Sequence, residues 1–521
     1  MKSKLFLRMS TSALAVAAAA FTSAATAKVL HPLAPLRQTA VPGQKFVNPK
    51  KANPWTNLKK PFPGPTGPSA LMLLTDGTVM VHSWCSSTWW KLTPDNKANY
   101  ANGTWSQTAS MQSSYKPFFF ASQVLPDGRM IVNGGEYNAS SEGNCGGGAW
   151  TNMGSLYDPV ADKWTPVDPP SGWTHIGDAQ SVILANGHYM LANALTTQEA
   201  IATIKGTKVT WTATGTGKAD RHDEEGWTLL PNNNLLTVDA TRRNTAFSFS
   251  EIYDAKAGTW STGPNTATAL VDPGSSELGP GALRPDGTVL YLGGLPTNNV
   301  YDFNTNTWSD VGALPVSGFD VADGPAVTLP TGNVLIEGSP GVFNPPAHFF
   351  EWDGSKFHQV TDPDDAPNDT SFEGRFLVLP TGQILYSNDG QSPTQPIIAV
   401  YQPSGKVNSE WRPKISSVAS SLSAGSSNNA ITGKNFNGFT EGAYYGDDAQ
   451  GATNWPTVMI KNNASGDICF ARSHDFSTSG VFNATKMKAK FDIPNSCETG
   501  ASTLTVSVNG ISSKGKSVTI N

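Results

Sequence analysis

Seven copies of one short pattern recur along the chain, and this repeat constrains the fold more than any other feature. Each copy is a short apolar run, a turn rich in Asp, Asn, Thr and Gly, and a second apolar run. The copies begin at Leu71, Ser122, Ser181, Trp227, Gly281, Ala326 and Phe376. Successive turns are 51, 59, 46, 54, 45 and 50 residues apart, and their marker residues are Asp76, Asp127, Asn186, Asn232, Asp286, Thr331 and Thr381. Because such turns supply the positive φ angles of tight hairpins, each copy is predicted to be a β-hairpin.

A second pair of strands is expected after most copies. It begins with an aromatic residue and ends in Trp or Phe, as in LYDPVADKW, IYDAKAGTW, VYDFNTNTW and FFEWDGSKF. Repeats of this length with four strands resemble kelch repeats, and seven of them imply a closed β-propeller. The predicted fold class is therefore all-β, with a seven-bladed propeller over residues 65–412.

The repeat stops after Trp411, and residues 413–521 show short alternating strands that favour an immunoglobulin-like β-sandwich. The Pro-rich segment 28–64 is either a linker or the strand that closes the propeller. A kelch propeller with a C-terminal sandwich resembles the architecture of galactose oxidase and glyoxal oxidase. That resemblance assigns residues 413–521 to the early-set domain of those enzymes.

Residues 1–27 have the pattern of a secretory signal peptide: basic residues, an apolar stretch, then Ala25-Thr26-Ala27. A secreted or periplasmic protein is expected. In that oxidising location the four cysteines are predicted to form two disulfides, Cys85 with Cys145 and Cys469 with Cys497.

Net charge and hydropathy limit the classes of molecule that the protein is expected to bind. The chain carries 36 Lys and Arg against 41 Asp and Glu, a formal charge of −5, so no nucleic-acid partner is expected. After the signal peptide no apolar run reaches the length of a membrane span. The protein is expected to be a monomer that binds a carbohydrate or another small polar substrate.

Carboxylates recur where the first strand of each predicted blade begins. In a propeller these strands line the central channel, and the loops that lead into them open on one face. The position eight residues before each turn is occupied by Pro68, Phe119, Asp178, Glu224, Leu278, Asp323 and Glu373, and Glu277 precedes Leu278. Five of the seven blades thus direct a carboxylate toward one opening of the channel.

Three interpretations of these acids stay open. Each acid could accept backbone N–H bonds from its own loop and hold the blades in register. Paired carboxylates with unequal pKa values could act as acid and base on a glycosidic bond. Oxygen ligands from several blades could instead hold a divalent cation such as calcium or manganese.

Histidines extend the candidate site. His175 and His222 lie just upstream of Asp178 and Glu224 and are candidate proton-transfer residues. By the oxidase resemblance, His474 lies on a segment that threads up the channel. His474 with Asp323 and Glu373 is then a candidate mixed-ligand metal site.

Aromatic and basic residues near the same opening suggest how a sugar ring could be held. Aromatic faces beside carboxylates suit sugars, although aromatic side chains also pack blades together. The candidate substrate-binding residues are Trp84, Trp89, Tyr137, Trp173, Arg242 and Arg375.

The radical centre of the copper oxidases is not matched. Where that family has its channel tyrosine this chain has Phe119, and its Tyr-His pair reads Phe372-Glu373 here. Copper is therefore not expected. We predict a secreted carbohydrate-active enzyme, a hydrolase or lyase that uses the carboxylates at the opening. A non-catalytic glycan- or partner-binding propeller and a divergent copper radical oxidase are the alternatives.

Overall fold

Almost all regular structure in the protein is β-strand. The structure is a computed structural model that describes residues 53–145, 150–242, 244–342, 344–390, 397–446, 448 and 451–521. Within these described ranges the helices are three short 3-10 turns, η2 (Ala366–Asn368), η3 (Ser371–Glu373) and η4 (Ser409–Trp411). Among the described residues, no helix has the length and apolar character that a membrane span needs. The predicted signal peptide, residues 1–27, lies outside the described residues.

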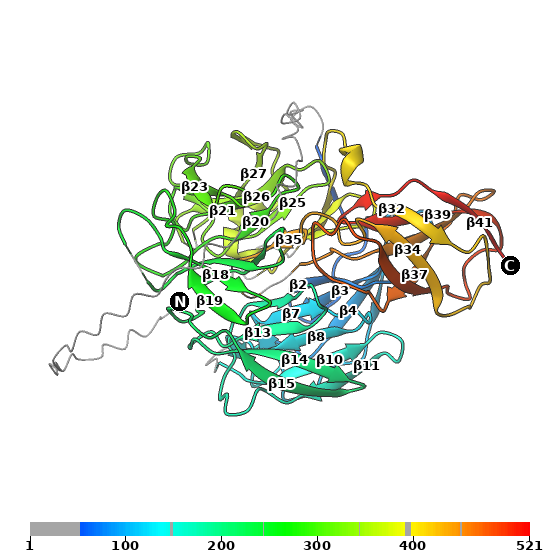
Figure 1. Cartoon of the computed structure of the whole chain (residues 1–521), viewed down its shortest axis with the longest axis horizontal. Helices are drawn as coiled ribbons and strands as arrows, with labels where there is room; N and C mark the ends of the chain where they lie inside the picture. Colours follow the sequence, from blue (N-terminus) through cyan, green and yellow to red (C-terminus); the bar gives the residue numbers. More distant parts are fainter. Residues whose placement is uncertain are drawn as a thin grey trace. The chain divides into compact units, whose positions relative to one another are not determined.

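Seven antiparallel sheets form the blades of a propeller, which confirms the predicted fold class (Figure 1). Blade 1 contains β2 (Pro68–Leu73), β3 (Val79–Ser83), β4 (Trp89–Thr93) and β5 (Thr104–Gln107). Blade 2 contains β7 (Ala121–Val124), β8 (Met130–Asn133), β10 (Gly154–Asp158) and β11 (Lys163–Val167), and an extra ribbon of β6 (Pro117–Phe118) and β9 (Tyr137–Asn138) lies beside it in the sequence. Blade 3 contains β12 (Ser181–Ile183), β13 (Tyr189–Ala192), β14 (Glu199–Lys205) and β15 (Lys208–Thr214).

The remaining blades repeat this order, with one variation in blade 6. Blade 4 contains β16 (Thr228–Leu229), β17 (Leu235–Val238), β18 (Ser250–Asp254) and β19 (Thr259–Thr262). Blade 5 contains β20 (Gly281–Leu283), β21 (Thr288–Leu292), β22 (Asn298–Asp302) and β23 (Thr307–Asp310). Blade 6 contains β25 (Ala326–Thr328), β26 (Val334–Pro340), β27 (His348–Trp352) and β28 (Phe357–Gln359), and β24 (Phe319–Asp320) pairs with β26. Blade 7 contains β29 (Gly374–Val378), β30 (Ile384–Asn388), β31 (Ile398–Tyr401) and β1 (Trp55–Asn57).

The inner hairpins form because their turn residues satisfy the turn internally. In blade 1, the Thr78 N–H donates to the Asp76 carboxylate at 3.0 Å, and Gly77 adopts a φ of 77°. Blade 5 repeats this arrangement with Asp286 and Gly287, where φ is 88°. A glycine is needed at this position because a side chain would strain the left-handed backbone.

The ring is closed by the N-terminal strand β1, which is the outermost strand of blade 7. Trp55 pairs with Tyr401 in β31, and its indole N–H donates to the Thr361 carbonyl at 2.7 Å. The Trp55 ring also contacts Phe349 and Tyr386, with centroids 5.1 and 5.5 Å away. Within the segment 28–64, residues 55–57 therefore form the closing strand, one of the two roles expected for it.

Replacing Trp55 tests this closure. Trp55→Ala removes a buried indole and its hydrogen bond, so we expect the free energy of unfolding to fall by about 3–5 kcal/mol. Chemical denaturation followed by tryptophan fluorescence measures the loss. The matched control is Thr56→Ala, because Thr56 is the exposed neighbour in the same strand. Equal free energies of unfolding for the two variants would contradict a stabilising role of Trp55 in closing the ring.

The C-terminal part of the chain forms a further curled sheet, consistent with the expected β-sandwich; an immunoglobulin-like topology stays a prediction. Its strand order is β32-β34-β38-β37-β36-β39-β41-β33, with β40 paired to β39. The strands are β32 (Lys414–Val418), β33 (Ser421–Leu422), β34 (Asn429–Lys434), β36 (Thr457–Asn462), β37 (Ile468–His474), β38 (Met487–Asp492), β39 (Gly500–Val508), β40 (Ile511–Ser512) and β41 (Lys516–Ile520).

This sheet contacts the inner hairpin turns of the propeller. The Ser473 N–H donates to the Thr75 carbonyl in blade 1, and the Ser479 N–H donates to the Ala185 carbonyl in blade 3. The Ser507 hydroxyl donates to the Pro380 carbonyl in blade 7. The C-terminal sheet therefore lies over the end of the channel where the hairpin turns are.

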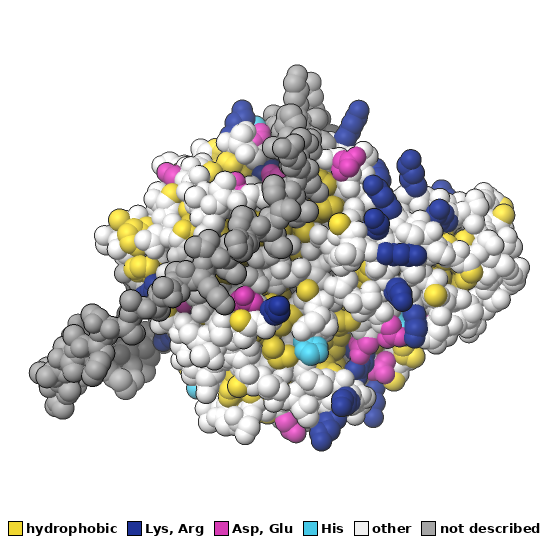
Figure 2. Space-filling view, viewed as in Figure 1, with side chains coloured by type: hydrophobic (Ala, Val, Ile, Leu, Met, Phe, Trp, Pro, Cys, Tyr) yellow, Lys and Arg dark blue, Asp and Glu magenta, His cyan; other side chains and the backbone are white. Residues whose placement is uncertain are grey.

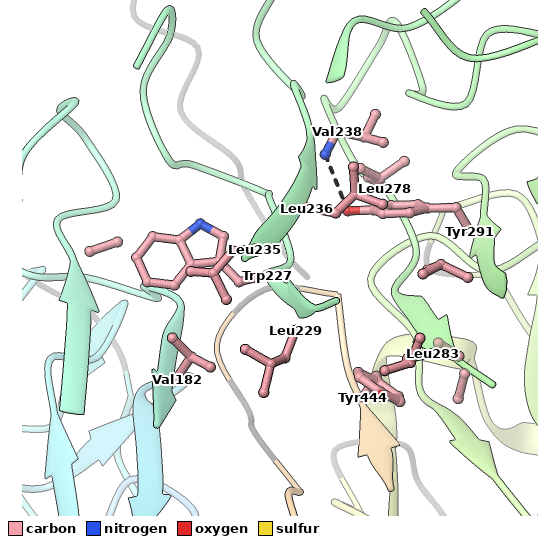
Figure 3. Close-up of a cluster of buried hydrophobic side chains, with 14 of the residues drawn as sticks. Val182, Trp227, Leu229, Leu235, Leu236, Val238, Leu278, Leu283, Tyr291 and Tyr444 are labelled. Carbon is pink, nitrogen blue, oxygen red and sulfur yellow. Dashed lines mark hydrogen bonds between the residues drawn. The ribbon is translucent and has the colours of Figure 1, made fainter. Parts of the chain in front are cut away.

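A segment of the C-terminal part runs from that end into the channel. We call residues 437–446, 448 and 451–455 the channel segment. Its strand β35 (Ala443–Tyr444) pairs with the inner strand β25 of blade 6, and its Glu441 carboxylate accepts the Leu229 N–H of blade 4 at 3.0 Å. Tyr444 packs among Leu229 and Leu283 from neighbouring blades (Figure 3). The segment thus fills the channel with packed side chains.

Candidate functional site

Six carboxylates meet at the end of the channel opposite the C-terminal sheet. We call this end the mouth. Its acids come from the loops that lead into the inner strands of blades 3 to 6, from the loop after β8, and from the tip of the channel segment. They are Asp178, Glu224, Glu277, Asp323, Glu136 and Asp448. The structure therefore brings together four of the five carboxylates that the repeat predicted.

Three of these acids from three consecutive blades form the tightest group. One carboxylate oxygen from each of Glu224, Glu277 and Asp323 lies within 4.8 Å of the others. The Asp323 N–H also donates to the Leu278 carbonyl at 3.1 Å, which ties the loop of blade 6 to that of blade 5. Hard oxygen donors at this spacing could hold a divalent cation such as calcium or manganese, whereas copper prefers imidazole or thiolate ligands.

Burial and mutual repulsion favour the protonated forms of two acids at the mouth. Burial raises the pKa of Asp178 well above its usual range, and the Glu136, Glu224 and Asp448 carboxylates raise it further. Burial likewise raises the pKa of Asp323; Glu224 and Asp448 add to the effect and the Arg375 guanidinium partly offsets it. Like charges converging on a buried site cannot all ionise together.

Two of the acids at the mouth, Glu224 and Asp323, lie in left-handed backbone. Phe119, Glu224 and Asp323 occupy the same position of the repeat, and their φ angles are 49°, 62° and 47°. Non-glycine residues rarely adopt this conformation, which costs roughly 1–3 kcal/mol at each position. Three blades therefore maintain the same strained turn at the mouth.

Exchange of Asp323 tests this geometry. Asp323→Gly and Asp323→Ala both remove the carboxylate, but only glycine adopts a positive φ freely. We expect the glycine variant to be the more stable by about 1 kcal/mol, measured by chemical denaturation. At Asp302, which is an extended residue of β22, the same pair of substitutions should show the opposite order. A more stable alanine variant at Asp323 would contradict the left-handed turn.

A buried arginine faces the acids from blade 7. The Arg375 guanidinium lies over the Tyr445 ring of the channel segment at 3.6 Å and within 5.7 Å of the Phe119 ring. It donates to the Phe372 and Gly374 carbonyls at 2.7 Å, and the Tyr445 hydroxyl donates to the same Phe372 carbonyl. Burial alone would lower the pKa of Arg375, but Tyr445, Asp448 and other nearby acidic groups raise it, so the cation is retained.

Aromatic side chains from blades 1 and 2 line the side of the mouth next to Arg375. Phe118 and Phe119 are stacked with centroids 3.8 Å apart, and Tyr137 and Trp84 pack against this pair. The disulfide between Cys85 and Cys145 belongs to the same cluster, with Cα atoms 5.6 Å apart, and the second disulfide joins Cys469 to Cys497. Both predicted disulfides are confirmed. We call the partly buried Trp84, Phe119 and Tyr137, which pack around the fully buried Phe118, the aromatic wall.

Tyr137 connects the aromatic wall to the acids. Burial raises its pKa, and the charges of Glu136, Asp178 and Glu224 raise it further, which places its hydroxyl in the field of the carboxylates. The predicted substrate-facing residues Trp84, Tyr137 and Arg375 are therefore all at or beside the mouth.

The loop that presents Glu224 is held by a buried charge cluster. The Lys218 ammonium contacts Asp220, Glu225 and Glu251 at 2.5, 3.1 and 2.7 Å. Burial alone would lower the pKa of Lys218, but the surrounding carboxylates outweigh burial and raise it. An ion network with one cation at its centre fixes this loop, because losing the cation would leave buried charges unpaired.

Several predicted site residues are packed elsewhere. The Glu373 carboxylate accepts the Thr370 N–H at 3.3 Å as part of a capping box. Glu373 therefore stabilises its own 3-10 turn, as expected of an acid that accepts backbone N–H bonds from its own loop. His222 is fully buried between blades 3 and 4, with its Nε2 2.8 Å from the Glu199 carboxylate and its ring against Trp227. His175 contacts the Thr174 hydroxyl at 3.1 Å. The structure gives neither histidine a bond to the carboxylates at the mouth.

Of the six predicted substrate-binding residues, three are likewise packed away from the mouth. Trp89 is fully buried against His82 and Trp164, and Trp173 lies in the core between blades, because large aromatic rings pack neighbouring blades. Arg242 pairs with Asp239 at 3.3 Å and stacks on Phe249. These three residues serve packing and loop structure and do not face the acids.

The predicted metal set of His474, Asp323 and Glu373 is not assembled. His474 ends β37 in the C-terminal sheet, where its ring nitrogens face Asp475 at 3.3 Å and Asp492 at 3.2 Å. The segment that enters the channel is the one around β35, which carries no histidine. The oxidase resemblance had assigned the threading role to the wrong segment.

Sequence reasoning missed three residues of the mouth. Glu136 follows a second strand instead of preceding a first strand, so counting back from the turns could not find it. Tyr445 and Asp448 lie in the C-terminal part, outside the repeat. The available signal was the sequence AYYGDDAQG, an apolar-aromatic run followed by two acids in an otherwise polar region.

Comparisons with known proteins give the fold alone. No family model matches the chain, and no curated protein matches it. Similar solved structures include a fungal alcohol oxidase of the AA5 family in complex with copper, at 16% identity and a TM-score of 0.37 over 87% of this chain and 85% of that one. A virginiamycin B lyase from Staphylococcus aureus has 9% identity and a TM-score of 0.44, over 67% and 99% of the two chains. YCF48 has 13% identity and a TM-score of 0.45, over 68% and 96%. Nothing about activity follows at these values.

Proposed function

We propose that the protein is a secreted carbohydrate-active enzyme, a hydrolase or lyase that works at the mouth of the propeller. The observation that carries this proposal is the convergence of carboxylates from four blades and the channel segment beside an aromatic wall. Flat aromatic faces next to charged hydrogen-bonding groups suit a sugar ring. The signal-peptide pattern and the two disulfides agree with an extracellular location.

Two of the carboxylates are suited to unequal roles. Asp178 is buried, with a pKa raised above its usual range, so it is the proton donor to the departing glycosidic oxygen. Glu224 is half-buried and its charge contributes to the raised pKa of Asp178, so we assign it the role of base or nucleophile. In hydrolysis Glu224 activates water or attacks the sugar; in elimination it removes a proton from the sugar ring. Two carboxylates held apart in pKa are what either reaction needs.

Amide substitutions test these roles. Asp178→Asn and Glu224→Gln keep the shape of each side chain but remove proton transfer, so we expect kcat to fall by about 10²- to 10⁴-fold with little change in KM. A panel of neutral and acidic polysaccharides, assayed for new reducing ends and for unsaturated products, provides the substrate. Asp310→Asn, on an outer strand of blade 5, is the control and should keep full turnover. Unchanged turnover in both mouth variants would overturn the proposal.

The pH profile tests the role of Asp178 separately. A proton donor works only while it is protonated, so turnover should persist below its raised pKa and fall as the pH rises through that pKa. The alkaline limb of kcat/KM should therefore lie well above the usual range of a carboxyl group, and Asp178→Asn should remove it from the residual activity. An alkaline limb that survives in Asp178→Asn would assign it to another group.

A non-catalytic glycan-binding propeller is the other function that the aromatic wall supports. A binder would show no turnover on any polysaccharide. It would lose affinity when Trp84 or Tyr137 is replaced by alanine, and the two amide substitutions would leave affinity unchanged. The same polysaccharide panel, read by binding and by turnover, separates the two functions.

A further inference from the structure

The C-terminal sheet carries an excess of positive charge that the rest of the chain lacks. Residues 413–521 contain nine Lys and Arg and seven Asp and Glu, although the whole chain has a formal charge of −5. Three of the seven acids fall within residues 437–455, the part of the sequence that enters the channel. The sheet is therefore left with nine basic and four acidic residues.

The basic residues gather on the outer side of three adjacent strands. Lys414 in β32 is the direct cross-strand partner of Lys434 in β34, and Lys488 in β38 is paired with Thr432 of β34. Burial alternates along β38, so that Lys488 and Lys490 are exposed while Met487 and its alternate neighbours are buried. Figure 2 shows Lys and Arg side chains in a file over this region.

Four of these lysines have no acidic partner among the residues that the structure describes. We call Lys414, Lys434, Lys486 and Lys488 the lysine face; Lys486 directly precedes β38, and all four are exposed. The other basic residues nearby are paired, as Lys490 with Asp475 and Arg472 with Asp492. Since like charges directly opposite each other destabilise a sheet, the Lys414–Lys434 pair lowers the stability of the C-terminal sheet.

We infer that the lysine face is a binding surface for an acidic polysaccharide, whose carboxylate groups would be spaced along a chain lying across β32, β34 and β38. Adjacent strands lie about 4.8 Å apart, so neighbouring lysines can meet successive anionic groups. Beside the lysines, Ser417 in β32 is exposed, and its hydroxyl group suits the hydroxyl groups of a sugar. Among the described residues the one exposed large hydrophobic side chain is Val160, in blade 2, so this face lacks the apolar anchors of a membrane-binding surface.

The inference does not depend on the function proposed for the mouth, because the two sites share no residue. A polysaccharide held on the C-terminal sheet would keep the protein on a polymer or a cell surface that contains it. Binding there would be electrostatic and would weaken as salt screens the charges.

Binding to polygalacturonate and to its neutral methyl ester tests the inference in the full-length mature protein. The test variant is Lys414→Gln/Lys434→Gln/Lys488→Gln. The matched control, Lys461→Gln/Lys514→Gln/Lys516→Gln, removes the same charge from exposed lysines of the same sheet near β36 and β41. We expect wild type and control to bind polygalacturonate and not the ester, and the test variant to bind roughly tenfold or more weakly.

Two further measurements, of thermal unfolding and of binding to lipid vesicles, make the outcome decisive. Thermal unfolding of the test variant should be no earlier than that of wild type, because the repulsion between Lys414 and Lys434 is gone. Equal loss of binding in both variants, or equal binding of the acid and the ester, would overturn the inference. So would lysine-face-dependent binding to vesicles of anionic lipid without binding to polygalacturonate, because the surface would then be a membrane site.

Discussion

Insertion of the channel segment into the propeller is the interaction on which the rest of the structure depends. Strand β35 adds to the inner edge of blade 6, and Glu441 accepts a backbone N–H from blade 4, so one segment joins two blades that are not neighbours in the ring. Burial raises the pKa of Glu441 to about 7, so the position is held against a desolvation cost. Because side chains of the channel segment fill the channel, the carboxylates gather at the end away from the C-terminal sheet. That end is the mouth.

The second constraint is electrostatic. The mouth gathers six carboxylates against one buried arginine, and such a group cannot stay fully ionised without a cation or protons. The fold holds it nevertheless, through left-handed backbone turns at Glu224 and Asp323 and through the Lys218 cluster behind the Glu224 loop. Arrangements that cost stability at one place are typical of functional sites. The aromatic wall and the stacked Arg375–Tyr445 pair give the same opening a face against which a flat ring can lie.

The sequence predicted the propeller well because its signal is local. Each hairpin is specified by its own turn residues, and counting a fixed number of residues back from Asn186 or Asn232 reached Asp178 and Glu224 correctly. The same counting misplaced Glu373, because this residue ends a 3-10 turn and its carboxylate caps the backbone of that turn. The substrate-binding role predicted for Trp89 and Trp173 was not found at the mouth, because composition does not distinguish an aromatic ring that packs two blades from one that faces solvent. The channel segment was not predicted, because its partner strand lies more than a hundred residues away in the sequence and no local pattern encodes that pairing.

A crystal structure of the Asp178→Asn chain with an oligosaccharide that it binds tests the central claim most directly. The account predicts density for a sugar at the mouth, with one ring against Phe119 or Tyr137 and a glycosidic oxygen within hydrogen-bonding distance of residue 178. A sugar bound only elsewhere on the propeller, with the mouth empty, would contradict a reacting centre formed by the carboxylates.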